Sequence, residues 1–352
     1  MKKTGILRAA VIGAGGIGHD HLASLAGDAR VRLVAVAETH PARAQEAAAR
    51  FRIQAVTDYR QLLCRPDIDL VTVALPNFLH APVALAALQA RKHVMVDKPI
   101  ATSLGEARAM EKAAQRARRF LMVGQNYRFR PETQSLKKQI LQGRLGQIYH
   151  LETTWFRRSG IPRIGSWFTQ KKFSGGGCVY DIGVHLLDAA LFLGGDFRAV
   201  SVSGQVRADF GPRGLGDGNW GRSEITKDRP FDVEDFASAF IRLKGGATVV
   251  LRISWACHHP EPNHEQVSLF GTKASARLFP AQVIAPTRGG GYEVEQIPLD
   301  CPLAHGNRIV HFVDCILGKA KSLVPVKESV QVQAILDAIY RSARTGREVR
   351  PG

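Results

Sequence analysis

The chain has 352 residues, which is longer than one hydrophobic core usually supports, and its 45% hydrophobic and 22% charged residues are typical of an ordinary globular protein. Its apolar runs stay short of the roughly 20 residues that a membrane helix needs, and its five cysteines form no CxxC pair, so we expect no membrane partner and a cytoplasmic location. The formal net charge of +17 is carried by scattered basic residues, which argues against a nucleic-acid partner and favours a surface that attracts anionic cofactors.

The first 127 residues alternate between short apolar strands and helices. Strands of this region alternate with helices of about ten to fifteen residues, which is typical of parallel βαβ units. The strands are almost continuously apolar, as in a sheet that is covered on both faces. The expected strands are 7–12, 31–37, 69–75, 94–96 and 120–123, and the expected helices include 41–50, 81–90 and 104–117. Residues 1–127 are therefore predicted to form one α/β domain.

The pattern changes after residue 127. A helix over 132–142 is followed by segments in which apolar and polar residues alternate, and turns such as Lys244-Gly245-Gly246 separate them. This alternation is typical of hairpins in a mostly antiparallel sheet. The expected strands are 148–155, 199–206, 237–243, 247–255 and 265–270, with a long loop over 210–231 and a helix over 328–343. Residues 128–352 are predicted to form a second, α+β domain.

A glycine-rich turn, Gly13-Ala14-Gly15-Gly16-Ile17-Gly18, lies between the first strand and the first helix. In a GxGxxG turn the first glycine makes a tight turn, the second lets the backbone approach a pyrophosphate, and the third lets the helix pack on the strand. The helix N-terminus supplies amide donors to the phosphates. Because the required strand and helix flank the motif, the sequence predicts a Rossmann-type dinucleotide site.

Glu38 ends the next strand, at the distance where an acidic residue accepts hydrogen bonds from the adenosine ribose. The alternative is a solvated acid at a strand end. A carboxylate here repels a 2′-phosphate, so NAD is favoured over NADP as the cofactor. Arg43 keeps NADP possible, because its guanidinium could pair with that phosphate or stack on adenine.

A strand-end lysine and an Asp/His pair complete the set of candidate catalytic residues. Lys98 follows the strand in Val96-Asp97-Lys98-Pro99, and Gly175-Gly176-Gly177 precedes Asp181 and His185, which lie i, i+4 on one expected helix face. Oxidation of an alcohol needs a base for the hydroxyl proton, and histidine suits this role. A lysine stabilises developing alkoxide charge, and Asp181 can orient it. The alternative, a surface Asp/His pair and a solvated lysine, does not explain why these residues coincide with a dinucleotide loop.

These motifs, together with Leu75-Pro76-Asn77-x-x-His80 and Ala37-Glu38, resemble the Gfo/Idh/MocA (glucose–fructose oxidoreductase and inositol dehydrogenase) family. The resemblance runs in register over essentially the whole chain. It implies a Rossmann domain followed by a C-terminal domain with an open sheet. It also implies a sugar or polyol substrate and assembly into a homodimer or homotetramer.

Carried over by position, the resemblance assigns Lys98, Asp181 and His185 to catalysis and Asn77, His80, Asp97 and Lys98 to the nicotinamide end of the cofactor site. The family more often has Glu before the lysine, and Asp97 is one methylene shorter. The expected cofactor-binding residues are Gly13, Gly15, Gly16, Ile17, Gly18, Glu38, Arg43, Leu75, Pro76, Asn77, His80, Asp97, Lys98 and Gln125. The expected substrate-binding residues are Lys98, Arg128, Trp167, Asp181 and His185.

Two groups of residues have plain structural alternatives. An arginine such as Arg128 is often a salt-bridged part of the scaffold rather than a ligand contact. A loose set of potential metal ligands is formed by Cys301, His305, His311 and Cys315. The last two fall on an expected apolar helix, which favours a core role, so no metal site is predicted.

Two classes of function remain open. The first is a dehydrogenase that transfers a hydride between NAD(P) and a secondary hydroxyl of a sugar, sugar derivative or polyol. The second is an NAD-dependent glycosidase that oxidises its sugar transiently, eliminates and re-reduces, which needs a further base or tyrosine that the sequence does not identify. A module that only binds nucleotide would lack Lys98 or His185, and both are present.

Overall fold

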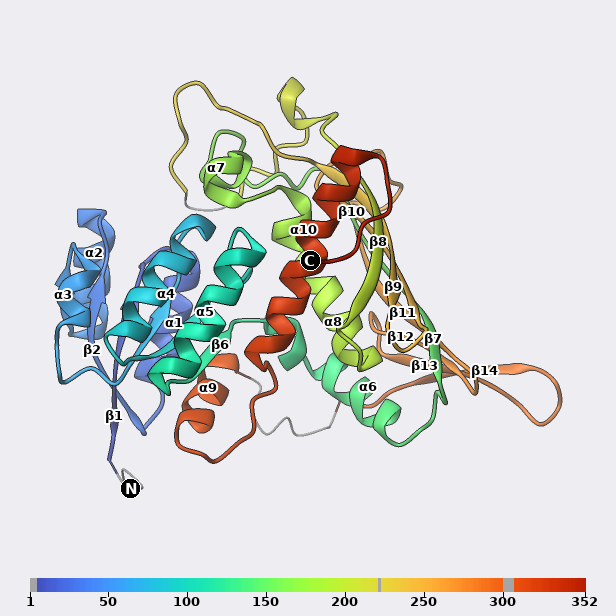
Figure 1. The fold of residues 1–352 in the computed structure, drawn as a ribbon, viewed down its shortest axis with the longest axis horizontal. Coiled ribbons are helices and arrows are strands. Elements are labelled where there is room, and N and C mark those ends of the chain that lie inside the picture. The colour runs from blue at the N-terminus through green and yellow to red at the C-terminus, as the bar shows by residue number, and fades with distance from the viewer. Residues whose placement is uncertain (1–4, 221–222, 300–306) are drawn as a thin grey trace. The chain divides into compact units, whose positions relative to one another are not determined.

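The computed structural model describes residues 5–220, 223–299 and 307–352, which divide into two compact units (Figure 1). The first unit comprises Met1–Gly124, Gly221–Ser223 and Asn307–Val330, and the second comprises Gln125–Trp220, Glu224–Gly306 and Gln331–Gly352. The sequence predicts a single boundary after residue 127. The structure instead places it after Gly124 and returns a late segment to the first unit, because helix α9 (Arg308–Ile316) packs on the first helix and the fifth strand.

The first unit is built on a six-stranded parallel sheet in the order β3-β2-β1-β4-β5-β6. Its strands are β1 Leu7–Ile12, β2 Val31–Ala37, β3 Gln54–Val56, β4 Leu70–Val73, β5 His93–Val96 and β6 Leu121–Val123. The chain proceeds outward from β1 to β3, then restarts on the other side of β1 at β4. Ligands of open parallel sheets bind beyond the carboxyl ends of the strands at such a reversal. This arrangement confirms the predicted Rossmann fold.

Helices connect these strands, and local sequence sets where several of them begin. The side chains of His40, Asp58 and Ser103 each accept a hydrogen bond from a backbone N–H of the following turn, as helix N-caps do. All four residues of β4 are buried, as expected for a sheet covered on both faces. The helices are α1 Gly16–Ala26, α2 Pro41–Phe51, α3 Tyr59–Leu63, α4 His80–Gln89 and α5 Leu104–Ala117, with a 3₁₀ turn η1 at Asn77–Leu79.

The second unit contains an eight-stranded sheet in the order β14-β13-β12-β11-β7-β10-β9-β8. Among the strand pairs that the structure describes in this second sheet, only β7–β10 is parallel, which confirms the mostly antiparallel prediction. The strands are β7 Ile148–Arg157, β8 Ala199–Arg207, β9 Phe236–Leu243, β10 Thr248–Ser254, β11 Asn263–Gly271, β12 Ser275–Arg277, β13 Gln282–Pro286 and β14 Tyr292–Gln296. The β13–β14 hairpin extends beyond the rest of this sheet (Figure 1).

Helix α8 (Val184–Gly194) packs on β7 and β11 and fills the core of the second unit. The helical segment Lys171–Gly194 is long and apolar enough to cross a membrane, which differs from the expectation of short apolar runs. Its most apolar window is 89% buried within the protein, as in a core helix. The other helices are η2 Asn126–Phe129, α6 Pro131–Leu141, η3 Trp167–Thr169, α7 Lys171–Ser174, the π-helical turn η4 Val179–Gly183, η5 Gly211–Arg213 and α10 Val326–Thr345, which crosses from the first unit into the second.

Candidate active site

The glycine loop contains two kinds of glycine. A Cβ at Gly13, where φ is +98°, would lie 2.2 Å from the carbonyl oxygen of Ala74, and one at Gly18 would lie 2.1 Å from the carbonyl oxygen of Gly13. At Gly15 and Gly16 a Cβ would meet nothing within 4 Å. Gly15 is the N-cap of α1 and has no side-chain cap, and the first turn holds no acidic residue. An open N-terminus lined by amide donors therefore lies where the pyrophosphate of a dinucleotide would bind.

Glu38 holds this loop to the end of β2. One carboxylate oxygen accepts a hydrogen bond from the Ala14 N–H at 2.8 Å, and the other accepts from the His40 N–H at 2.8 Å and from Arg43 at 3.2 Å. Burial would raise the pKa of Glu38, but these hydrogen bonds outweigh it and hold the pKa below its ordinary value. Glu38 is therefore ionised at neutral pH. Arg43 lies beside Glu38, and its charge is offset by the carboxylate.

His80 joins two loops at the carboxyl edge of the first sheet. Its Nδ1 lies 2.7 Å from the carbonyl oxygen of Pro99, and its Nε2 lies 2.8 Å from that of Leu75. The side chain is only 1% exposed, and burial lowers its pKa despite these two carbonyls. The resemblance assigns His80 to the nicotinamide end. The structure gives it a buried bridging role that fixes the peptide next to Lys98, and it leaves Asn77 buried in the adjacent turn.

Asp97 faces two partners that the sequence analysis did not identify. Its carboxylate lies 3.6 Å from Nε2 of His21 and 3.7 Å from the guanidinium of Arg308. A Cβ at Gly124 would approach the same carboxylate to 2.7 Å, so a glycine is needed there. Burial lowers the pKa of His21 to about 4, so His21 is neutral at physiological pH. Arg308 belongs to no sequence motif and lies in the late segment that is part of the first unit. Motif spacing therefore could not reveal that it lies next to Asp97.

Asp181 and His185 lie at the start of the central helix of the second unit. Asp181 belongs to the π-helical turn η4 rather than to an α-helix, and its carboxylate accepts a hydrogen bond from the fully buried indole of Trp255 at 2.9 Å. His185 packs beside Tyr127 and Trp155, with ring centroids 4.8 and 6.3 Å away. Single-turn π-helices often occur at functional sites. The i, i+4 spacing indicates the Asp/His pair in the sequence, whereas no motif marks the aromatic residues that pack around it.

Arg128 does not match its expected role in substrate binding. Its side chain has no exposed surface, and it donates hydrogen bonds to both carboxylate oxygens of Asp188 at 2.8 and 2.6 Å. Its guanidinium also lies over the rings of Phe192 and Phe197. A side chain enclosed in this way cannot reach a ligand, so the structure corrects Arg128 from a substrate contact to a scaffold residue.

The remaining predicted residues have varied surroundings. Trp167 is partly exposed and stacks on Phe168 with ring centroids 3.8 Å apart. Gln125 is 1% exposed, and its amide oxygen has no hydrogen-bond partner among the described residues. His311 is buried and accepts a hydrogen bond from the Leu323 N–H, as a core histidine would. Cys301 and His305 lie outside the described residues.

The parallel sheet, its glycine loop and Glu38 define a dinucleotide-binding domain of the Rossmann class. The family model described as "Oxidoreductase family, NAD-binding Rossmann fold" matches residues 7–125, and the "GFO/IDH/MocA C-terminal domain" matches residues 133–277. The chain belongs to the Gfo/Idh/MocA family.

Three known proteins illustrate the similarity. The chain is 32% identical over 345 residues to the D-glucoside 3-dehydrogenase of Escherichia coli (strain K12), covering 97% of each chain. It is 36% identical over 305 residues to the putative UDP-kanosamine synthase oxidoreductase subunit of Amycolatopsis mediterranei (strain S699), covering 84% of each. A solved structure of levoglucosan dehydrogenase in complex with NADH and levoglucosan has a TM-score of 0.82 and 26% identity, and covers 98% of this chain and 99% of that one.

The buried pair of Arg128 and Asp188 leads to a stability prediction. Arg128→Met removes one partner and leaves a buried carboxylate uncompensated, so we expect a loss of about 3–5 kcal/mol in the free energy of unfolding, measured by urea denaturation. The double variant Arg128→Met/Asp188→Leu should recover most of this loss, because it leaves no unpaired charge. A single variant as stable as the parent protein, or a double variant that is stable but has lost substrate affinity, would contradict the scaffold role.

Proposed function

We propose that this protein is an NAD-dependent dehydrogenase that oxidises a secondary hydroxyl of a sugar, sugar derivative or polyol. The observation that carries the proposal is the presence in one chain of an open glycine loop with Glu38, a strand-end Lys98 and an Asp181–His185 pair fixed by a buried tryptophan. The similar proteins named D-glucoside 3-dehydrogenase and levoglucosan dehydrogenase support a sugar as the substrate.

The residues of the chain divide the chemistry between them. When bound, NAD accepts the hydride from the carbon that is oxidised. Amides at the start of α1 bind the pyrophosphate, and Glu38 accepts hydrogen bonds from the ribose hydroxyls. His185 takes the hydroxyl proton on an imidazole nitrogen, and the ammonium group of Lys98 stabilises the negative charge that develops on the substrate oxygen. Asp181 is held by Trp255 in the turn that precedes the helix carrying His185.

The glycosidase alternative has less support. It needs a further base or tyrosine, and Tyr127 is the tyrosine that packs on His185. Burial is the largest cause that raises the pKa of Tyr127 well above its ordinary value, and the negative charge of Glu265 is the second. The phenol therefore stays protonated at neutral pH. A protonated phenol is a poor base. In an assay, a dehydrogenase releases NADH in proportion to substrate oxidised, whereas a glycosidase releases aglycone without net NADH.

We further propose that the protein is a homodimer or homotetramer that associates through the outer face of the second sheet. Along β9 the buried residues Ala237, Ala239 and Ile241 face the core, and the alternate residues Phe236 and Phe240 face away and are partly exposed. Phe156 of β7 stacks on Phe236, with ring centroids 6.2 Å apart. Apolar side chains that cluster on the outer face of a sheet often mark an association surface, which supports self-association.

A cytoplasmic location, without a membrane or nucleic-acid partner, is also part of the proposal. The cysteines that the structure describes, Cys64, Cys178, Cys257 and Cys315, are free thiols, which suits a reducing compartment. Several basic side chains are engaged in local ion pairs, such as Arg65 with Asp67 and Arg207 with Asp209, which lowers the charge that they present to an anionic partner.

The site predicts the choice of cofactor. Because Glu38 is ionised and repels a 2′-phosphate, NAD should bind at least about tenfold more tightly than NADP in isothermal titration. Glu38→Gln keeps the hydrogen-bonding shape but removes the charge, so it should reduce this preference. Equal or reversed affinities in the parent protein would show that Arg43 dominates the local field.

The proposed roles of Lys98 and His185 predict distinct kinetic losses. Lys98→Ala should lower turnover at least about a hundredfold and leave NAD affinity within a few-fold, because its charge matters most as the alkoxide forms. His185→Ala should lower turnover similarly and remove the low-pH limb of the rate profile, which reports protonation of the base. Asp181→Asn should be less damaging.

Lys112→Ala, at an exposed position on α5, is the matched control and should leave turnover unchanged. The assay is NADH absorbance with monosaccharides, anhydrosugars and inositols. If His185→Ala keeps both its rate and its low-pH limb, another group is the base and the mechanism is wrong.

The outer sheet face predicts self-association. Light scattering of the parent protein at micromolar concentration should show dimers or tetramers. Phe240→Glu places a charge on the proposed interface and should shift the mass toward the monomer, while Tyr292→Phe on the exposed β14 should not. A parent protein that is only monomeric would contradict this part of the proposal.

A further inference from the structure

Two glycines before the catalytic helix are required by what packs against them. A Cβ at Gly176 would lie 2.0 Å from the phenol oxygen of Tyr340, and one at Gly177 would lie 2.0 Å from the carbonyl oxygen of Glu234. Neither glycine has a positive φ, unlike Gly175, where φ is +82°. Gly176 and Gly177 are therefore explained by close approach of Tyr340 and Glu234 rather than by backbone conformation.

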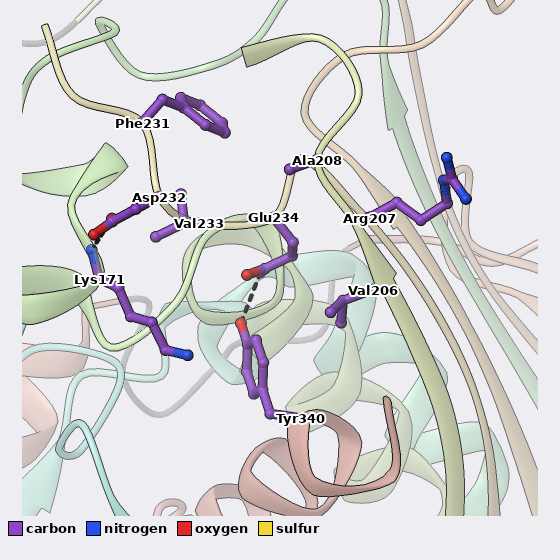
Figure 2. Close-up of a pocket in the computed structure, with 9 residues that line it drawn as sticks. All are labelled: Lys171, Val206, Arg207, Ala208, Phe231, Asp232, Val233, Glu234 and Tyr340. Atoms are coloured by element: carbon purple, nitrogen blue, oxygen red, sulfur yellow. Dashed lines mark hydrogen bonds between the residues drawn. The ribbon is translucent and has the colours of Figure 1, made fainter. Parts of the chain in front are cut away.

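The carboxylate of Glu234 is buried against the start of the same helical run. Its oxygens accept hydrogen bonds from the Gly177 N–H at 2.9 Å, from the Val179 N–H at 3.0 Å and from the phenol of Tyr340 at 2.7 Å. Figure 2 shows the Glu234 and Tyr340 side chains meeting end to end. The first N–H groups of a helix lack partners within the helix, so Glu234 caps this run from a distant part of the chain.

Two further hydrogen bonds join the segment 232–234 to the segment 171–178, which precedes the catalytic helix. Asp232 accepts a hydrogen bond from the Lys171 N–H at 2.6 Å, and the Cys178 N–H donates to the carbonyl oxygen of Glu234 at 3.2 Å. A surface pocket of about 390 Å³ opens beside these contacts. It is lined by Lys171, Val206, Arg207, Ala208, Phe231, Asp232, Val233, Glu234 and Tyr340 (Figure 2).

The energy balance makes the hydrogen bonds to Glu234 important. Burial raises the pKa of Glu234, and the hydrogen bonds from Tyr340, Val179 and Gly177 oppose this rise. Removing a donor to a buried carboxylate leaves part of its desolvation cost uncompensated. The position of the helix start thus depends on both Glu234 and Tyr340, which we call the Glu234–Tyr340 clamp.

We propose that the Glu234–Tyr340 clamp positions Asp181 and His185 for catalysis by fixing the backbone at Gly177 and Val179. Asp181 follows Val179 by two residues, within η4, and His185 lies in the first turn of α8. Neither member of the clamp touches the reacting atoms, so both are positioning residues. The inference rests on the proposed function only where it concerns turnover, since the effect of the clamp on the helix is independent of substrate.

The first measurement is amide hydrogen exchange in the segment 177–185, which needs no activity. Tyr340→Phe removes one donor and Glu234→Gln removes the charge, and each should raise exchange there about tenfold, corresponding to the loss of roughly one hydrogen bond. Tyr292→Phe and Glu293→Gln, at exposed positions on β14, are the matched controls and should leave exchange in this segment unchanged. Unchanged exchange in both clamp variants would overturn the proposal. If Glu234→Gln does not fold, Tyr340→Phe decides the test.

The second measurement separates positioning from general stability. The clamp variants should lower kcat about tenfold or more and leave KM for NAD within about twofold, because the cofactor loop belongs to the other unit. In an Asp181→Asn background, Glu234→Gln should lower kcat by a much smaller factor than it does in the parent protein. This is the result expected if Glu234 acts on turnover through Asp181. Two results would overturn the positioning role: raised exchange with an unchanged kcat, or losses in kcat from Glu234→Gln and Asp181→Asn that are fully additive in the double variant. A parent protein that oxidises no sugar or polyol would reject the proposed function, while the exchange result would still decide the clamp.

Discussion

Buried carboxylates that accept hydrogen bonds from backbone N–H groups hold two glycine-rich turns of this protein in place, the cofactor loop and the turn before the catalytic helix. Glu38 accepts from Ala14 inside the cofactor loop, and Glu234 accepts from Gly177 and Val179 before the catalytic helix. Asp235, the neighbour of Glu234, does the same for the turn at Asp209, Phe210 and Gly211. Glycine-rich turns expose N–H groups that strands and helices do not use. In each case a carboxylate next to the end of a strand satisfies them. Burying this carboxylate is costly, but it fixes the turn at a defined place.

Within the six residues of the cofactor loop, some glycines are needed for packing of the fold and others leave room for a ligand. Gly13 and Gly18 lie against backbone carbonyl groups, so a side chain at either position would push the strand and helix apart. Gly15 and Gly16 face open space, so the fold itself does not require glycine there. What requires it is the close approach of a ligand to the backbone.

Residues close in sequence to a motif were predictable, and residues brought there by the tertiary fold were not. The spacing from the glycine loop predicts Glu38, which accepts a hydrogen bond from the Ala14 N–H, and the i, i+4 spacing predicts that Asp181 and His185 share one helical run. Trp255 and Arg308 could not be found this way, because each reaches its partner from an element far along the chain and belongs to no motif. Arg128 was misassigned for a related reason. The sequence around Arg128 does not show that Asp188 is its partner. From sequence alone, an arginine in a buried ion pair cannot be told from an arginine that lines a cleft.

The surroundings of Lys98 favour its use as a local positive charge. Asp97 and Arg308 lie close enough for their charges to offset one another, so the acid preceding the lysine does not act as an isolated negative charge. Burial lowers the pKa of both His21 and His80, which keeps these imidazoles uncharged at neutral pH. None of these four groups therefore adds to, or takes much from, the charge that Lys98 brings to the end of β5. His80 meanwhile fixes the adjacent Pro99 carbonyl group, so the backbone that carries this charge is held before a substrate arrives. Charge held in place beforehand stabilises a developing alkoxide without the cost of reorganising its surroundings during the reaction.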